Sequence, residues 1–138
     1  MDFSLVTLRG VKYKGSISEL LLRTTDGDIV IMPQHEALTA IVKPGPLVIR
    51  TKDNKEEIFA IFGGLLDISG NEAKLISDEV DHMDDIVESN IKEAIQRAET
   101  IKKQSQDKAE INLAERDLDR HAIRLDVYRL KRRHHKKY

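Results

Sequence analysis

The apolar residues of this chain change their spacing near residue 84. Before that point they occur in short stretches rich in β-branched and aliphatic residues, which is typical of strands. Eight stretches stand out: FSLVTL, SELLLRT, DIVIM, LTAIV, PLVIRT, EIFAIF, LLDI and AKLIS. Turn-forming pairs such as Asp26-Gly27 and Gly70-Asn71 separate them. Short strands at this spacing predict an all-β sandwich, or flattened barrel, over residues 1–84.

After residue 84 the apolar residues follow helical spacing instead. Asp84 or Asp85 stands where the N-cap of a first helix is expected. The stretch KKQSQDK, residues 102–108, has no apolar residue and predicts a turn. The first stripe is Val87, Ile91, Ala94, Ala98 and Ile101, and the second is Ile111, Ala114, Leu118, Ala122 and Leu125.

These two stripes predict an antiparallel helical hairpin over residues 85–138, so the whole chain is expected to be an α+β protein of two units. Several stripe positions are Ala, and the opposite faces are densely charged. A hairpin with so little apolar surface is marginal by itself. We therefore expect it to dock on another surface, and to be able to do so in more than one arrangement.

The charge is divided between the two units. The net charge is −1, but residues 1–84 hold 14 acidic and 9 basic residues, whereas residues 85–138 hold 10 acidic and 14 basic ones. The basic excess lies in the last ten residues, RLKRRHHKKY. The chain has no cysteine, no N-terminal signal pattern and no apolar stretch near the roughly 20 residues that span a bilayer. We expect a protein that is soluble, or peripheral to a membrane through its partners.

A search for catalytic chemistry finds none. The sequence contains no G-x-S-x-G and no P-loop pattern. His35 and His82 are isolated, and the rings of His134 and His135 would diverge on a helix, so no metal site is expected. The pair Gly63-Gly64 indicates a bulge or tight bend where side chains do not fit. A small-molecule β-barrel has little support, because no set of pocket residues stands out.

Three arginines, Arg116, Arg120 and Arg124, recur every four residues on the second predicted helix. They form a basic rail that the tail, from Arg129 onward, extends. Asp117 and Asp119 flank the rail and could simply pair with it. The rail is therefore either a solvated face or a surface for an acidic partner. A nucleic-acid-binding module that uses the basic tail is the alternative, although the acidic sandwich and the few aromatics near the tail disfavour it.

Four motifs in order resemble the epsilon subunit of the bacterial and chloroplast rotary ATP synthase. They are GDIVIMPQH (27–35), LTAIVKPGPLVIR (38–50), FGGLLDI (62–68) and LISDEVD (75–81). The resemblance covers essentially the full chain, including the change of spacing near residue 84. The sequence departs from the family pattern at Val30, Gln34, Phe62 and Leu65. We interpret these departures as changes in sandwich packing rather than in role.

The resemblance implies a non-catalytic subunit of the proton-translocating ATP synthase, with no cofactor of its own. Its sandwich would bind the gamma subunit and the membrane-embedded c-ring, with Asp28 and His35 as candidate c-ring contacts. Its hairpin would lie folded or extend toward the catalytic beta and alpha subunits and restrain ATP hydrolysis. The candidate contacts to an acidic partner are Arg116, Arg120, Arg124 and Arg129.

The resemblance also bears on nucleotide binding and location. Some members bind ATP through I/L-D-x-x-R-A, but here Val87, Asn90 and Ile91 replace the Asp, Arg and Ala. Nucleotide binding is therefore not expected, although Arg97, with Arg120 and Arg124, could still contact phosphate. We expect a peripheral protein on the cytoplasmic face of a bacterial plasma membrane, or alternatively on the stromal face of the thylakoid.

Overall fold

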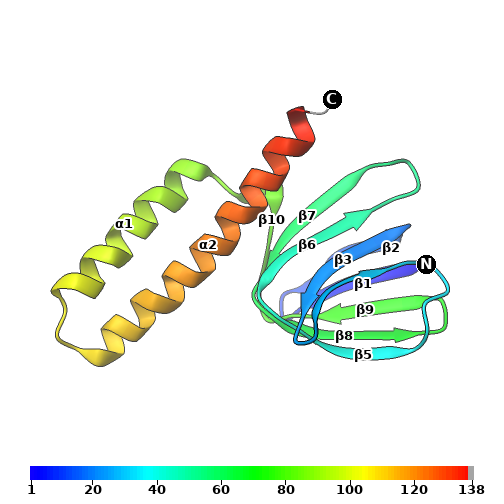
Figure 1. Ribbon diagram of the computed structural model, residues 1–138, viewed down its shortest axis with the longest axis horizontal. Helices are drawn as coiled ribbons and strands as arrows, with labels where there is room; N and C mark the ends of the chain where they lie inside the picture. Colours follow the sequence, from blue (N-terminus) through cyan, green and yellow to red (C-terminus); the bar gives the residue numbers. More distant parts are fainter. Residues whose placement is uncertain (137–138) are drawn as a thin grey trace.

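The computed structural model describes residues 1–136, which form a β-sandwich followed by two long helices (Figure 1). All ten strands end before residue 84 and both long helices begin after it, which confirms the predicted α+β architecture. The strands are β1 (Asp2–Thr7), β2 (Gly10–Ser16), β3 (Glu19–Thr24), β4 (Gly27–Ile31), β5 (Leu38–Val42), β6 (Gly45–Arg50), β7 (Glu56–Ile61), β8 (Gly64–Ser69), β9 (Glu72–Ile76) and β10 (Val80–His82).

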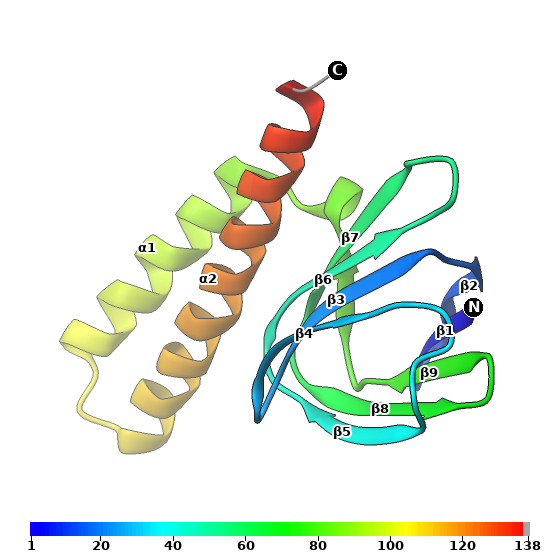
Figure 2. The ribbon, with the colours of Figure 1, turned by 45° about the vertical axis from the view of Figure 1, so that its right-hand side comes forward.

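Hydrogen bonds join the strands in the order β10-β7-β6-β3-β5-β8-β9-β1-β2, and β4 pairs with β3. The path folds over between β3 and β5, where Thr24 and Val42 make the only pairing recorded between them. One layer therefore holds β10, β7, β6, β3 and β4, and the other holds β5, β8, β9, β1 and β2 (Figures 1 and 2). β1 and β9 are parallel, whereas the other paired strands are antiparallel.

Alternating apolar positions along the strands fill the space between the layers. β1 contributes Phe3 and Leu5, and β9 contributes Leu75; all three are at most 1% exposed. Further fully buried side chains of this main core are Leu20, Ile31, Leu47, Ile49, Leu66 and Ile68. Two strands escaped sequence reasoning. β2 is mostly exposed with little apolar alternation, and β10 has only three residues.

The junction between sandwich and hairpin differs from expectation. Asp84 or Asp85 was predicted as the N-cap of the first helix, but both lie in a 3-10 turn, Met83–Asp85, whose N-cap is His82. The first long helix, α1, spans Glu88–Gln104, and its N-cap, Val87, makes no side-chain capping bond. The prediction was wrong because Met83 and Ile86 are buried, which draws this segment against the sandwich before the helix starts.

The second long helix, α2, spans Lys108–Lys136 and runs antiparallel to α1 (Figure 1). The polar turn between them is confirmed, although α1 reaches Gln104 and only Ser105–Asp107 lies outside both helices. Asp107 caps α2, because its Oδ1 accepts a hydrogen bond from the Ala109 amide at 3.0 Å. The tail from Arg129 to Lys136 continues α2, as expected, and residues 137–138 lie outside the described part of the chain.

The predicted apolar stripes are only partly buried. Ile91, Ala98 and Ala114 are buried as expected, but Val87 is 49% exposed and Ala122 is exposed as well. The residue of α2 that is completely buried is Val127, which lies outside the predicted stripe. The stripes assumed that the helices pack only on each other, whereas the C-terminal half of α2 also faces the sandwich.

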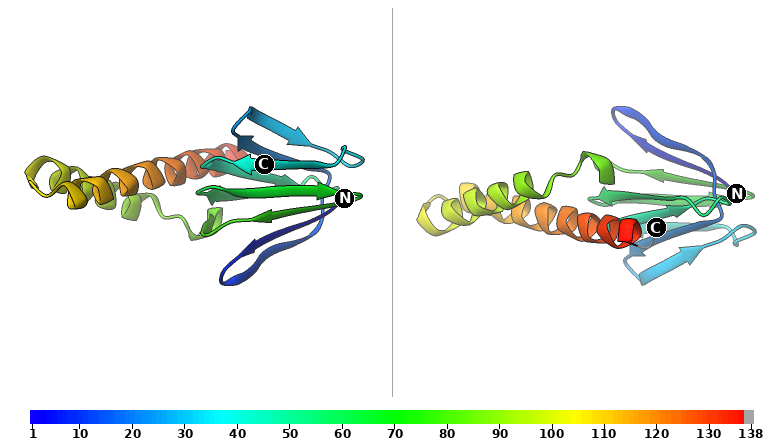
Figure 3. Two further views of the ribbon diagram at one scale, coloured as in Figure 1. Left: turned by 90° about the horizontal axis from the view of Figure 1, so that it is seen from below. Right: turned by 90° about the horizontal axis from the view of Figure 1, so that it is seen from above.

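The hairpin docks through a second apolar cluster on the outer face of β6 and β7. Ile58 and Ala60 of β7 point out of the sandwich and are fully buried there. The remaining buried members are Met83, Ile86, Ile91 and Val127. The turn end of the hairpin extends beyond the sandwich, so only part of α2 packs on the strands (Figure 3). The hairpin is thus held at one end of its length.

Candidate functional site

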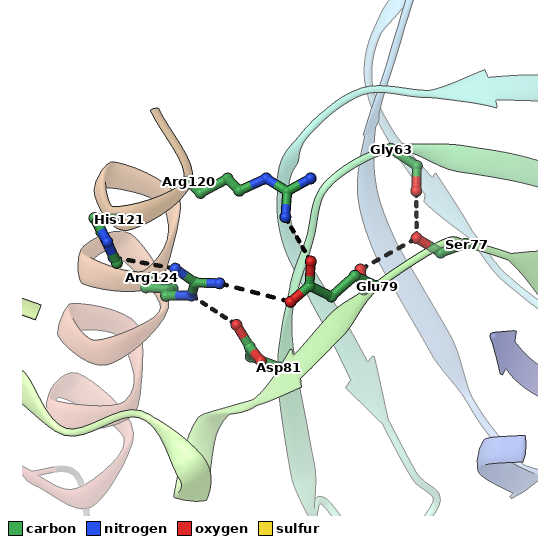
Figure 4. A network of polar contacts seen from close by, with 7 residues as sticks. All are labelled: Gly63, Ser77, Glu79, Asp81, Arg120, His121 and Arg124. Atoms are coloured by element: carbon green, nitrogen blue, oxygen red, sulfur yellow. Dashed lines mark hydrogen bonds and ion pairs between the residues drawn. The ribbon is translucent and has the colours of Figure 1, made fainter. Parts of the chain in front are cut away.

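Two arginines of α2 meet two acids of the sandwich where the hairpin docks (Figure 4). Arg120 Nη1 donates to Glu79 Oε2 at 2.5 Å, and Arg124 Nε donates to Asp81 Oδ2 at 2.6 Å. Arg124 Nη2 also lies 4.0 Å from Glu79 Oε1. We call this group, Arg120, Arg124, Glu79 and Asp81, the acidic latch. It brings together residues more than 40 positions apart in the chain.

The ring of Phe62 lies beneath the latch. The guanidinium carbons of Arg120 and Arg124 are 5.1 Å and 5.0 Å from the ring centroid. Exposed ion pairs contribute about 0–1 kcal/mol each and a cation over a ring about 0.5–1 kcal/mol. The latch therefore stabilises the docked hairpin by about a few kcal/mol, which is small enough for a partner to overcome.

The segment that carries the latch acids is held firmly. Ser77 is buried, and its Oγ donates to the carbonyl oxygen of Gly63 at 2.5 Å. A Cβ added to Gly64 would lie 2.4 Å from the Ile76 carbonyl oxygen, so only glycine allows β8 and β9 to approach this closely. This close approach bears out, at Gly64, the interpretation of Gly63-Gly64 as a place where side chains do not fit; Gly63 has room for a Cβ but takes a positive φ of 112°. The close approach also fixes the position of the chain between β9 and β10, which carries Glu79 and leads to Asp81.

His121 lies beside the latch on α2. Arg124 Nη1 donates to His121 Nδ1 at 3.0 Å, which requires that nitrogen to be unprotonated. Burial lowers the pKa of His121, and the positive charge of Arg124 lowers it further. The neutral imidazole is thus part of the docked arrangement, a role that sequence reasoning did not assign to this histidine.

The nucleotide motif of the resembling family falls on a hollow of about 230 Å³ beside the latch. Of its degenerate positions, Ile91 is buried in the second apolar cluster, whereas Val87 and Asn90 are exposed. Two carboxylates, Asp81 and Asp85, line this hollow and disfavour a phosphate there. The hollow is further lined by Ile86, Val87, Asn90, Ile91, His121 and Arg124.

The basic rail is divided by the structure. Arg120 and Arg124 are paired in the latch, whereas Arg116 is exposed on the part of α2 that precedes it. The acids that bind the rail come from the sandwich, and not from the flanking Asp117 and Asp119 as the sequence suggested.

The first residues of the basic tail also form ion pairs with acidic side chains. Arg129 lies 3.9 Å from Asp126 of its own helix. Lys131 reaches Asp84 of the 3-10 turn at 3.2 Å. The first part of the basic tail is therefore not a free arm, because one of its cations already pairs with the sandwich side of the junction.

The two candidate c-ring contacts do not form one cluster. Asp28 is the second residue of β4, and its Oδ1 lies 3.4 Å from Arg23 Nε of β3. His35 lies in the loop after β4, and its Nδ1 is 2.7 Å from the Glu36 carbonyl oxygen. Asp28 is exposed and His35 is half-buried, and they lie near the two ends of the segment 27–35.

An exposed apolar row crosses the outer face of the second layer. Ile41 of β5 pairs with Leu65 of β8, which pairs with Ile76 of β9. Ile76 in turn pairs with Val6 of β1, and Val6 pairs with Val11 of β2. Ile41, Leu65, Ile76 and Val11 are 60%, 45%, 50% and 60% exposed. We call these five residues the apolar row; it is about 19 Å long at the usual strand spacing.

None of the four departures from the family pattern belongs to the main core between the layers, although Phe62 packs against the second apolar cluster. Val30 and Leu65 point outward and are 49% and 45% exposed. Gln34 occupies a left-handed conformation with φ of 67°, where the family pattern has glycine. Phe62 supports the latch. Two of the four therefore contribute to the apolar row and the latch.

Two further findings concern residues 1–136 alone. No helix within this range is long and apolar enough to cross a membrane. The same range contains no group of three or more metal-ligating side chains placed to hold an ion.

The fold is that of a β-sandwich with one uncovered apolar row, followed by a docked helical hairpin. A known protein family has the same kind of sandwich. The model described as "ATP synthase, Delta/Epsilon chain, beta-sandwich domain" matches residues 1–82. The chain belongs to the ATP synthase delta/epsilon family and is thus a non-catalytic subunit of the rotary ATP synthase. This membership confirms the resemblance seen in the four motifs and decides against the nucleic-acid alternative.

Individual relatives extend the match beyond the sandwich. The ATP synthase epsilon chain of Psychrobacter arcticus is 30% identical over 125 residues, covering 91% of both chains. That of Sinorhizobium fredii is 32% identical over 97 residues, covering 67% of this chain and 72% of its own. The first of these alignments is long enough to include much of the helical hairpin.

Solved structures show the same fold. A chain of the Euglena gracilis mitochondrial ATP synthase, solved as the OSCP/F1/c-ring assembly, superposes with a TM-score of 0.78 at 19% identity, covering 90% of this chain and 78% of its own. A chain from the central stalk and c-ring of the Tetrahymena thermophila enzyme gives 0.60 at 18% identity, covering 93% and 96%. At these identities the likeness concerns the fold alone.

Proposed function

We infer that this chain is a rotor subunit that joins the gamma subunit to the c-ring and restrains ATP hydrolysis through its hairpin. The unit of residues 1–84 would carry the rotor contacts, and the unit of residues 85–138 would be regulatory. The proton-translocating enzyme would lie in a bacterial plasma membrane, with this subunit peripheral on the cytoplasmic face. The structural relatives come from an OSCP/F1/c-ring assembly and from a central stalk with its c-ring, which supports such partners.

The single observation that carries the rotor assignment is the apolar row. The outer face of β6 and β7 is also apolar, but there α2 covers Ile58 and Ala60. On the opposite layer no element of residues 1–136 covers Ile41, Leu65 or Ile76. A contiguous apolar row on a sheet face is a typical protein-binding surface. We assign it to the gamma subunit, the partner that the family resemblance gives to the sandwich.

The c-ring contact is assigned to the segment 27–35. Asp28, Val30 and Met32 alternate along β4 and the residue that follows it, and all three point outward. His35 follows in the loop. An acid, a histidine and two exposed apolar side chains suit the polar rim of a protein interface.

The regulatory assignment concerns Arg116, Arg120, Arg124 and Arg129. In the docked hairpin two of them already bind carboxylates, which supports an acidic surface of the catalytic subunits as their second partner. The hairpin is long and held at one end, so it could extend when that contact is lost. Nucleotide is not assigned to the hairpin, since Asp81 and Asp85 line the hollow at the degenerate motif.

Copurification with gamma tests the rotor assignment. Substituting Ile41→Lys and Leu65→Lys places two charges in the apolar row, and we expect the complex with gamma to be lost. Leu113→Lys is the matched control, because Leu113 is an apolar residue of the hairpin with 59% exposure. The control should still bind gamma, and gamma binding that survives in the row variant would refute this assignment.

A further inference from the structure

We propose that Glu79 and Asp81 are an internal substitute for an acidic partner, holding Arg120 and Arg124 until an acidic protein segment competes for them. The docked hairpin would then need no bound ligand, and its release would be a competition between two acidic surfaces. The identity of the competitor as a catalytic subunit rests on the proposed function, whereas the latch itself does not.

In the docked hairpin, the guanidinium group of Arg124 already contacts three side chains. A guanidinium offers N–H donors from three nitrogens. Nε donates to Asp81, Nη2 faces Glu79, and Nη1 donates to His121. The Nε and Nη2 edge of the guanidinium, which suits a carboxylate with two parallel bonds, therefore already faces the sandwich acids. An external acid that takes this edge must displace Asp81 and Glu79.

Phe62 restricts the arginines to the docked arrangement. The guanidinium carbons of both arginines lie about 5 Å from its ring centroid, so the ring and the carboxylates hold the same two groups in place. Figure 4 shows Glu79 between the two arginines, where it contacts both. Neutralising the acids should therefore loosen α2 from the sandwich without disturbing the main core.

The latch is also open to a competitor. The side chains of Glu79 and Arg120 are 49% and 45% exposed, so an approaching acidic segment can reach them without prior unfolding. Arg124 and Asp81, at 19% and 30%, are more protected. Arg116, exposed one turn away, is placed for a first contact. Exchange would thus begin at Arg116 and Arg120 and end at Arg124.

Removing the acids and removing the arginines should therefore change the rate of ATP hydrolysis in opposite directions. Removing the acids removes only the internal partner, so the hairpin should extend more readily and restrain hydrolysis more strongly. Removing the arginines removes the group that both partners need, so restraint should weaken. A merely structural ion pair would give the same direction in both cases.

Hydrogen exchange on the isolated full-length chain tests the latch. Glu79→Gln with Asp81→Asn should speed exchange of the α2 amides near Arg124 by about tenfold. Asp78→Asn is the matched control, since Asp78 is an exposed acid of the same segment, and it should change nothing. Equal exchange in the acid variant and wild type would overturn the latch.

Poly-L-glutamate serves as the acidic probe. Added to the wild-type chain it should speed α2 exchange, whereas poly-L-lysine should not. The effect should be absent from a chain with Arg120→Ala and Arg124→Ala, whose hairpin is already loosened. An unchanged wild-type exchange rate at saturating poly-L-glutamate would contradict competition by an acidic surface.

The rate of ATP hydrolysis by the assembled catalytic head then tests whether the two variants act in opposite directions. The acid variant should hydrolyse ATP more slowly than wild type, and the arginine variant faster. Changes in the same direction would overturn the competition. If removal of the whole hairpin leaves hydrolysis unchanged, the proposed restraint fails, and the exchange experiments still decide on the latch.

Discussion

Arg124 of α2 donates to Asp81 of β10 at 2.6 Å, and this contact ties α2 to the edge of the sandwich. The two residues stand 43 positions apart, on opposite sides of the change from strands to helices. Because α2 is held by such surface contacts and one apolar cluster, we expect it to detach without unfolding of the sandwich.

The first prediction concerns removal of the hairpin. Deleting the chain from Asp107 onward removes α2 with all four candidate arginines, so hydrolysis by the catalytic head should rise several-fold. Assembly with gamma should persist, because the apolar row is left intact. Both are measured in a reconstituted enzyme, with the full chain as reference. A head that hydrolyses at the same rate with either chain would contradict the regulatory assignment.

The second prediction concerns the apolar contact of α2. Val127 is completely buried against the sandwich, so Val127→Ala should weaken hairpin docking by about 1–2 kcal/mol. The change is measured as faster hydrogen exchange in α2, while the sandwich amides keep their protection. Leu113→Ala is the control, because that side chain is 59% exposed. Equal effects of the two variants would mean that Val127 does not hold the hairpin.

The third prediction concerns pH. The pKa of His121 is lowered from its ordinary value of 6.5 by burial and by Arg124 and Arg97, against the opposite influence of Asp117 and Asp81. A histidine with a lowered pKa favours the docked state above its ordinary pKa, and this contribution is lost as pH falls through the lowered value.

Hairpin exchange should therefore accelerate on acidification below about pH 6.5, measured at several pH values and corrected for intrinsic exchange rates. His121→Gln removes the titrating group and should remove this step. A step of the same size in that variant would assign the pH dependence to other groups.

The fourth prediction concerns Gly64. A Cβ there would lie 2.4 Å from the Ile76 carbonyl oxygen, so Gly64→Ala should destabilise the sandwich by about 1–3 kcal/mol in urea unfolding. Gly15→Ala is the matched control, since its Cβ would approach nothing closer than 3.5 Å. A small effect at Gly64 would show that β8 and β9 can separate there.

Much of the fold followed from local pattern. The strands before residue 84 and the two helices after it were foreseen, because spacing along a single element reveals its type. The two missed strands lack that signal: β2 exposes most of its residues, and β10 is short. The helix start was misplaced because burial of Met83 and Ile86 outweighs the capping preference of Asp84 and Asp85.

The site was foreseen in part. The spacing of Arg116, Arg120 and Arg124 identified a basic rail, but no local pattern pointed to Glu79, Asp81 or Phe62 as its partners. The stretch SDEVD, which contains both acids, was recognised only as part of a family motif and not as a partner of the arginines. An excess of acids in the sandwich and of bases in the hairpin was the one available signal, and it indicates attraction between the units without naming residues.

The sequence by itself determined the order of most strands and of the two helices, because element type depends on spacing along a single segment. Only the tertiary structure decided which acids meet Arg120 and Arg124, and that Ile41, Leu65, Ile76, Val6 and Val11 line up in one row. Both depend on strand register and on the docking of α2. These are set by packing between segments far apart in the chain, which leaves no periodic trace in the sequence.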